Sequence, residues 1–255
     1  MAVTRLDGRR IIITGGASGM GESLVRAFPE LGARVVSLDL TAEAGRKIAQ
    51  ESGAHFVEVD VSNKESVDAA FDAAIEILGG LDVLIHAAGI APASPAADNT
   101  VELWNKVVAV NSLGTMLTNQ AAFRHFKDNG GGQIINFASA AGIEGYVNKS
   151  IYAASKGAVV AWSRSIANEW AKSDVTVNMI APAIWTPMYD KTRSEMTAEQ
   201  LEAHDEFMRT AVPIGGKLGD AGKDFVPVMA FYSSEGAGFI TGQVVAVDGG
   251  TLQLR

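Results

Sequence analysis

The sequence predicts an α/β fold, a doubly wound domain with helices on both faces of a seven-stranded, mainly parallel sheet. Short runs of continuous apolar residues recur along the chain, and segments with the apolar spacing of helices separate most of them. This alternation is typical of parallel pairing, because helices then cover both faces of the sheet. The chain has 255 residues and no low-complexity linker, so residues 1–255 are expected to form one domain.

Each predicted strand is a short apolar or β-branched run. The first is RRIIIT at residues 9–14, and the others lie at 33–39, 54–60, 81–87, 132–139, 175–181 and 243–249. Residues 62–79 have apolar side chains at helical spacing, and Ser62 with Glu65 predicts a capping box at the start of that helix. Ligands of such sheets bind beyond the carboxyl ends of the strands, so the residues after each run are the candidates for a site.

Composition argues against several classes of function. The net charge is −8, with 29 acidic and 21 basic residues and no long run of either sign, so no nucleic-acid partner is expected. There is no cysteine for thiol chemistry, and the four histidines form no metal-binding pattern, so no metal is expected. No apolar stretch approaches the roughly 20 residues of a membrane span, and the N-terminus does not resemble a signal peptide. These features predict a cytoplasmic protein with no membrane partner.

Glycines directly after the first strand predict a dinucleotide cradle of the Rossmann type. The stretch TGGASGMG at 14–21 places Gly15, Gly19 and Gly21 at the start of a helix. Such glycines permit a tight turn, a close approach of backbone to a pyrophosphate, and packing of helix on strand. The alternative is a glycine-rich turn that binds nothing.

Acidic residues end the second and third strands. Asp39 is placed to accept hydrogen bonds from ribose hydroxyls and to repel a 2′-phosphate, and no arginine follows it at 40–42. The predicted cofactor is therefore NAD(H) rather than NADP(H). Asp60 either holds the edge of adenine or caps the helix that follows it.

Tyr152 and Lys156 lie one helical turn apart, in SIYAASKGA at 150–158. A free phenol is a poor base at neutral pH, and a neighbouring ammonium favours its ionised form, which predicts a lowered pKa and a general acid/base. The pair alone is weak support, because such spacing also occurs on solvated helices.

Four stretches together resemble the short-chain dehydrogenase/reductase family. They are the glycine cradle, NSLG at 111–114, INFASAAG at 135–142 and YAASK at 152–156, and the resemblance runs from Arg9 to the ITGQVVAVDGG at 240–250. It implies that Asn111, Ser139, Tyr152 and Lys156 form a catalytic tetrad. Ser139 would bind the substrate oxygen, Tyr152 would exchange its proton, Lys156 would hold the nicotinamide ribose, and Asn111 would position a water.

The same resemblance implies a set of cofactor-binding residues, with Ile184 against nicotinamide and Thr186 on its carboxamide. The set is Gly15, Ser18, Gly19, Met20, Gly21, Asp39, Leu40, Asp60, Val61, Ala88, Gly89, Tyr152, Lys156, Pro182, Ile184 and Thr186. Three motifs depart from the family: His86 replaces the first asparagine of N-N-A-G or N-A-A-G, Phe137-Ala138 stands before Ser139 where a second serine is common, and Pro182-Ala183 replaces Pro-Gly. His86 is expected to support the sheet and not to act in catalysis.

The predicted substrate wall is largely apolar and lacks a lysine or arginine cluster. It comprises stretches 90–96, 142–148 and 184–189, which predict a fairly hydrophobic, uncharged secondary alcohol or ketone as substrate. Glu144 either binds a substrate hydroxyl or is a solvated loop carboxylate. The candidate substrate contacts are Ala91, Ala141, Glu144, Tyr146, Trp185, Met188 and Tyr189.

Residues 184–215 are expected to form a substrate lid, with a helix that starts at Thr197 and has a capping box to Gln200; the alternative is a solvated surface helix. The helix from Tyr152 has apolar residues on more than one side, and the family usually assembles through such helices, so a homotetramer or homodimer is expected. The expected function is an NAD(H)-dependent alcohol dehydrogenase or carbonyl reductase. The alternatives are a ketoreductase of carrier-bound acyl thioesters and a nucleotide-sensing regulator without catalysis.

Overall fold

The structure is a computed structural model that describes residues 4–252, apart from the side chain of Met188. Its strands are β1 (Arg10–Thr14), β2 (Arg34–Asp39), β3 (His55–Glu58), β4 (Val83–His86), β5 (Gly132–Phe137), β6 (Val175–Pro182) and β7 (Val244–Val247). Its helices are α1 (Gly19–Ala27), α2 (Ala42–Ser52), α3 (Lys64–Leu78), α4 (Val101–Val108), α5 (Gly114–Phe126), α6 (Ala141–Glu144), α7 (Ser150–Trp170), α8 (Pro187–Ser194), α9 (Ala198–Ala211) and α10 (Val226–Tyr232). Short helical turns are η1 (Ala96–Asp98), η2 (Ala109–Leu113), η3 (Ala171–Ser173), η4 (Ala221–Phe225) and η5 (Glu235–Ala237).

The strands form one sheet in the order β3-β2-β1-β4-β5-β6-β7, and every neighbouring pair is parallel. The predicted doubly wound fold is confirmed, with a sheet that is wholly rather than mainly parallel. The chain moves outward from β1 to β3 and then returns to place β4 on the other side of β1. In such sheets the crevice for a ligand opens where the order reverses, here beyond the carboxyl ends of β1 and β4.

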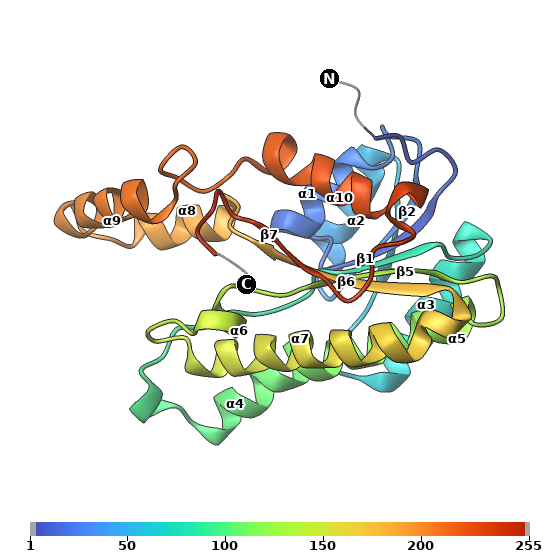
Figure 1. Cartoon of the computed structure of the whole chain (residues 1–255), viewed down its shortest axis with the longest axis horizontal. Helices are drawn as coiled ribbons and strands as arrows, with labels where there is room; N and C mark the ends of the chain where they lie inside the picture. The colour runs from blue at the N-terminus through green and yellow to red at the C-terminus, as the bar shows by residue number, and fades with distance from the viewer. Residues whose placement is uncertain (1–3, 253–255) are drawn as a thin grey trace.

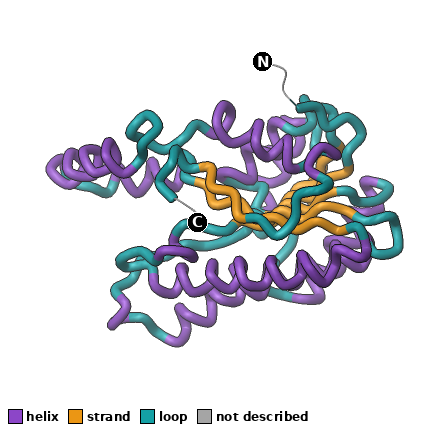
Figure 2. Tube along the Cα trace, in the orientation of Figure 1, coloured by secondary structure: helices purple, strands orange, loops and turns teal. Residues whose placement is uncertain are grey.

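Helices cover both faces of the sheet, as Figures 1 and 2 show, with α7 on one side and α1, α2 and α10 on the other. Successive strand residues point to opposite faces, so Ile12 packs with the layer of α3, α5 and α7, whereas Ile11 and Ile13 pack with the layer of α1 and α10. Burying a side chain of this size stabilises a fold by roughly 1.5–3 kcal/mol. The two apolar layers therefore hold the strand ends in fixed positions beneath the crevice.

The helix predicted over 62–79 is α3, but its predicted capping box at Ser62 and Glu65 is wrong. The residue that caps α3 is Asn63, whose side chain accepts a hydrogen bond from the backbone N–H of Ser66. Ser62 instead donates its hydroxyl to the carboxylate of Asp60. Asparagine is at least as good a cap as serine, so the neighbouring residue takes the position.

Across residues 4–252, no helix combines the length and the apolar character that crossing a membrane requires.

Candidate functional site

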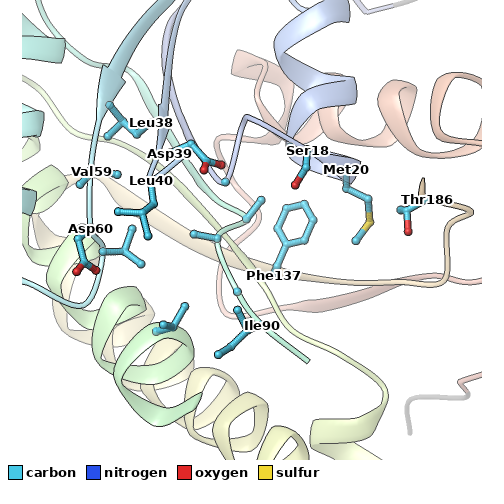
Figure 3. Close-up of a pocket in the computed structure, with 18 of the residues that line it drawn as sticks. Ser18, Met20, Leu38, Asp39, Leu40, Val59, Asp60, Ile90, Phe137 and Thr186 are labelled. Atoms are coloured by element: carbon cyan, nitrogen blue, oxygen red, sulfur yellow. The ribbon is translucent and has the colours of Figure 1, made fainter. Parts of the chain in front are cut away.

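A cleft of about 460 Å³ opens at the reversal of strand order, and Figure 3 shows the side chains around it. Asp39, Leu40 and Asp60 gather at one end, and Thr186 lies at the opposite end. Among the residues predicted to bind a cofactor, the cleft is lined by Gly15, Ser18, Gly19, Met20, Gly21, Asp39, Leu40, Asp60, Val61, Ala88, Gly89 and Thr186. Tyr152, Lys156, Pro182 and Ile184 do not line it.

The glycine turn is tight because it packs against backbone. Gly15 has φ +70°, and a Cβ there would lie 2.7 Å from the backbone nitrogen of Ala88. A Cβ on Gly21 would lie 2.1 Å from the carbonyl oxygen of Gly15. Any larger residue at these positions would push the first turn of α1 away from the strands. Ser18, Gly19 and Met20 therefore present the N-terminus of α1 to the cleft, where free N–H groups favour an anion.

The carboxylate of Asp39 is held by two backbone donors at the edge of the cleft. Its Oδ2 accepts from the N–H of Ala17 at 3.0 Å, and its Oδ1 accepts from the N–H of Thr41 at 2.9 Å. Each oxygen keeps a further lone pair for a ligand. The carboxylate thus joins the end of β2 to the glycine turn and stays available to a pair of hydroxyl donors.

Asp60 stabilises the turn before α3 and also lines the cleft. Its Oδ1 accepts from the backbone N–H of Ser62 at 2.9 Å and from the Ser62 hydroxyl at 2.6 Å. The residue also lines the cleft. The interpretation of Asp60 as a helix cap is wrong, since Asn63 caps α3, and Asp60 instead closes the preceding turn through one oxygen while the residue lines the cleft.

Asn111 is fully buried in η2, a single wide turn between α4 and α5. Its side chain exchanges hydrogen bonds with the backbone N–H (2.8 Å) and C=O (2.9 Å) of Ile90, and it donates to Ser155 at 2.9 Å. Ile90 lines the cleft. Asn111 therefore fixes the loop after β4, while its own carbonyl accepts from Thr115.

Tyr152 and Ser139 are brought together by α7 and the end of β5, close enough for the Ser139 side chain to act on the pKa of the Tyr152 phenol. Burial raises the pKa of the Tyr152 phenol, and the hydrogen bond with Ser139 acts in the opposite direction. Ser139 also accepts from the N–H of Ala141 at 3.2 Å. The sequence predicted a lowered pKa for Tyr152, and the structure shows the reverse because burial outweighs the hydrogen bond.

Lys156 is buried below Tyr152 on α7, and its ammonium donates to the carbonyl oxygen of Phe137 at 2.6 Å. Burial lowers its pKa to about 8, so the group still carries its charge at neutral pH. A Cβ built on Gly89 would lie 3.6 Å from the ammonium and 3.2 Å from the Asn111 side-chain oxygen. Gly89 thus lets the cleft reach two of the predicted catalytic side chains.

His86 is buried in the row formed by Thr14 of β1, His86 of β4 and Asn136 of β5, which pair in register. Its Nδ1 lies 2.9 Å from the Thr14 hydroxyl and 3.0 Å from the Thr118 hydroxyl. The Thr14 hydroxyl also accepts from the N–H of Ala88 at 3.2 Å. His86 therefore links the sheet and α5 to the loop that lines the cleft, and burial lowers its pKa to about 3.

The predicted substrate residues fall into two groups. Ala141 is buried in α6, whereas Glu144 at the end of α6 and Tyr146 just beyond it are exposed. Partial burial, and after it the charge of Glu144, raises the pKa of Tyr146. Ala91 accepts from the Lys149 ammonium at 2.5 Å, a lysine next to the 142–148 stretch that the sequence interpretation did not include. The predicted contact of Met188 rests on a side chain outside the described residues.

Trp185 and Tyr189 form the other group, at the start of α8 where α8 meets α9. Their rings meet edge to face, with centroids 4.8 Å apart. The Tyr189 hydroxyl lies 2.6 Å from the Nε2 of His204 on α9. Arg193 lies over both rings, 5.2 Å and 5.6 Å from their centroids, and forms a two-pronged ion pair with Asp205. We call these side chains, Trp185, Tyr189, Arg193, His204 and Asp205, the lid clip.

The start of α9 follows the prediction. Thr197 accepts from the N–H of Gln200, and the Gln200 side chain accepts from the N–H of Thr197, so the capping box is confirmed. Arg193 and Asp205 were missed, because the charged sequence around them has no motif and only the packing of α8 on α9 pairs them. The cleft is also lined by residues that the predicted cofactor-binding set left out, which are Leu38, Val59, Ala87, Ile90, Lys106, Val110, Phe137 and Pro187.

Comparison with known proteins gives concordant results. A family model described as short chain dehydrogenase matches residues 9–197. The chain is 35% identical to (2S)-[(R)-hydroxy(phenyl)methyl]succinyl-CoA dehydrogenase subunit BbsD of Thauera aromatica, covering 96% of this chain and 97% of that protein. It is 33% identical to D-threitol dehydrogenase of Mycolicibacterium smegmatis, covering 96% and 94%. A crystal structure assigned to a short-chain alcohol dehydrogenase of Sinorhizobium meliloti 1021 superposes with a TM-score of 0.88 at 32% identity, covering 98% of each chain.

Proposed function

Because the chain belongs to the short-chain dehydrogenase family, we propose that it is an NAD(H)-dependent dehydrogenase. The family consists of oxidoreductases that act on alcohols and ketones and use a nicotinamide cofactor. The reaction would interconvert a secondary alcohol and a ketone. The observation that supports the proposal is the meeting of Ser139, just after β5, with Tyr152, which shares α7 with Lys156. A phenol, a hydroxyl donor and a buried ammonium at one strand end suit proton exchange with a carbonyl oxygen.

The residues of the cleft fit the cofactor. The N-terminus of α1 would hold the pyrophosphate, the fixed carboxylate of Asp39 would accept from the adenosine ribose, and Thr186 would lie at the nicotinamide end. A 2′-phosphate would meet the negative charge of Asp39, and this repulsion supports NAD(H) over NADP(H). When bound, the cofactor supplies the group that accepts or donates hydride.

In the reducing direction, Tyr152 donates its proton to the substrate oxygen, and the Ser139 hydroxyl donates a hydrogen bond to the same atom. The raised pKa of Tyr152 keeps the phenol protonated at neutral pH, as this step requires. In the oxidising direction, Tyr152 takes the proton of the alcohol, and the charge on Lys156 favours the phenolate that receives it. Lys156 loses its proton above a pH of about 8, so this support weakens there.

The substrate would have a largely apolar, uncharged body. Trp185, Tyr146 and Tyr189 would supply most of the wall, and residues 184–215 would act as a lid over the reacting carbon. Residues 1–255 would work as one domain. The exposed side of α7 would join a second copy, giving a homodimer or homotetramer.

The first test is turnover of NAD against a panel of secondary alcohols that includes cyclic, steroidal, aryl and sugar members. Tyr152→Phe is expected to lower turnover by roughly 10²-fold or more and to leave NADH affinity near that of the unaltered protein. The matched control is Tyr232→Phe on α10, outside the cleft, which should turn over normally. Full activity of Tyr152→Phe would remove Tyr152 from the mechanism. NADH binding with silence across the whole panel would favour a sensor.

A further inference from the structure

Lys149 is a half-buried lysine whose ammonium is used by a loop of the chain and not by a carboxylate. It stands directly before α7, the helix that carries Tyr152. Its ammonium donates to the carbonyl oxygen of Ala91, in the loop after β4, at 2.5 Å. No ion pair joins it to a carboxylate among residues 4–252. Burial lowers the pKa of this ammonium, which is therefore partly withdrawn from water where it holds the loop.

Residues 90–99, which we call the β4 loop, have η1 as their one element of regular structure and depend on tertiary contacts for their position. At the start of the loop, the Asn111 side chain bonds both backbone groups of Ile90. Further along, the backbone N–H of Ser94 donates to the carbonyl oxygen of Asn148 at 2.9 Å. The β4 loop is thus held by a buried side chain at one point and by the segment before α7 at another.

The segment before α7 contacts the β4 loop through three consecutive residues. Asn148 has φ +58°, a left-handed conformation that asparagine adopts more readily than most residues, and its carbonyl oxygen accepts from the loop. Lys149 holds Ala91, and the Ser150 hydroxyl accepts from the Asn99 side chain at 2.8 Å. We call these three hydrogen bonds the loop latch.

The loop latch sets where the β4 loop lies relative to the Tyr152 phenol. Tyr152 is in the first turn of α7, and Ala91 is one of the predicted substrate contacts. A shift between the two segments would therefore change the space in which a substrate meets the phenol. Lys149 supplies the one charged donor of the latch, and charge-assisted hydrogen bonds are stronger than neutral ones. Its loss should loosen the loop more than the loss of either neutral bond.

We propose that Lys149 is a positioning residue, which holds the β4 loop where a substrate is received beside Tyr152. The inference rests on the proposed dehydrogenase function and adds a residue that acts through Ala91. Without the ammonium, the loop occupies the receiving position for only a fraction of the time. Affinity for the substrate falls by that fraction, whereas turnover of bound substrate and binding of NADH stay as they were.

The test compares Lys149→Met, which removes the ammonium, with Lys149→Arg, which keeps a charged donor. With the panel alcohol that the unaltered chain oxidises best, Lys149→Met is expected to raise KM by about tenfold and to change kcat by less than about twofold. Lys149→Arg should recover most of the lost affinity. The NADH dissociation constant, measured by fluorescence, should be the same in all three proteins.

Hydrogen exchange followed by mass spectrometry examines the loop without any substrate. Peptides that cover residues 91–99 are expected to exchange about tenfold faster in Lys149→Met than in the unaltered chain, while those of β5 should not change. The matched control is Lys172→Met in η3, which removes an exposed lysine. It should match the unaltered chain in kinetics and in exchange.

An unchanged KM in Lys149→Met would overturn the proposal, whether or not kcat falls, because a loss of folded protein lowers kcat alone. A loss confined to alcohols that carry a carboxylate would also overturn it, since Lys149 would then bind the substrate directly. If the unaltered chain oxidises no alcohol, the proposed function fails and the inference falls with it. The exchange rates of residues 91–99 distinguish that failure from a failure of the loop latch itself.

Discussion

The carboxylate of Asp39 has a structural task and an electrostatic one, and the two can be separated. Its oxygens accept from Ala17 and Thr41, so they hold the glycine turn against β2. Removal of the whole side chain would disturb this turn as well as the charge. Asparagine keeps one acceptor oxygen at nearly the same position and removes the charge.

Asp39→Asn is therefore expected to narrow the preference for NAD over NADP by roughly tenfold, mainly through tighter binding of NADP, because the repulsion of the 2′-phosphate is lost. The measurement is kcat/KM for both cofactors with one alcohol. Asp7→Asn, on the exposed partner of Arg5, is the matched control and should leave the ratio as it was. An unchanged ratio in Asp39→Asn would show that another group selects the cofactor.

His86 makes the free energy of unfolding depend on pH in the acid range. Burial lowers its pKa to about 3 in the folded chain, against about 6.5 for an unfolded histidine. The unfolded chain therefore binds the extra proton between these two values. Above pH 6.5 both states are neutral at this residue, and below it the free energy of unfolding falls by about 1.4 kcal/mol per pH unit.

His86→Asn should flatten this dependence, since asparagine keeps hydrogen-bonding groups toward Thr14 and does not titrate. Between pH 7 and pH 5 the variant is expected to lose about 2 kcal/mol less than the unaltered chain, measured by urea unfolding. His55→Asn, on the exposed residue of β3, is the control and should follow the unaltered chain. Parallel pH curves for both variants would contradict the neutral state of buried His86.

At the scale of residues, motifs located most of the cleft. The glycines, Asp39 and Asp60 were predictable because each sits where a parallel strand ends, and the geometry of such ends is common to many sheets. Lys106 and Arg193 were not predictable, since an isolated basic residue on a helix carries no sign of what it faces. The direction of the Tyr152 pKa was wrong because burial, which opposes the phenolate, is not visible in the spacing of Tyr152 and Lys156.

Among the elements, α8 and α9 act as one unit through the lid clip. Arg193 and Asp205 join them, and Tyr189 reaches His204. The clip orders the rings of Trp185 and Tyr189, which are the predicted wall of the substrate space. A loosened clip should therefore affect the substrate more than the cofactor.

Asp205→Asn is expected to raise the KM for the alcohol by roughly threefold to tenfold, while the NADH dissociation constant stays constant. Steady-state kinetics and NADH titration check the two parts. Glu206→Gln is the matched control, because it removes a neighbouring carboxylate of α9 whose partner Arg209 lies outside the clip. Equal effects of the two variants on KM would mean that α9 responds to charge in general and not to the clip.

All seven strands were predictable as elements, because short continuous apolar runs bounded by turns are typical of the buried strands of a doubly wound sheet. The ends of the strands were less predictable, since the run predicted at 81–87 forms β4 only at Val83–His86. The start of α3 was misplaced by one residue because Ser62 and Asn63 are both good caps. The capping box of α9 was found because Thr197 has no such competitor beside it.

At the scale of the whole molecule, a groove of about 990 Å³ between α5 and α7 is where a second copy is expected. Met116, Phe123 and Trp162 line it, and the Phe123 ring stacks on Trp170 with centroids 4.1 Å apart. Ala161 is exposed within it. Desolvation of this surface would favour association of two copies.

Ala161→Glu is expected to raise the dissociation constant of the assembly by at least about tenfold, because a buried unpaired carboxylate is costly. Sedimentation velocity measures the change. Ala69→Glu adds the same charge to the exposed side of α3 and should leave the assembly intact. A monomeric unaltered chain would contradict the proposed homodimer or homotetramer.

The strand order has a consequence for the newborn chain. The cleft draws on residues from Gly15 to Pro187, so during synthesis the dinucleotide has no complete pocket until α8 has left the ribosome. Until β4 emerges, the part of the sheet made by β3, β2 and β1 has an open hydrogen-bonding edge at β1, a strand that will lie inside the sheet between β2 and β4. While Val83–His86 is still inside the exit tunnel, the edge of β1 is therefore unpaired and the cleft is too incomplete to hold a cofactor.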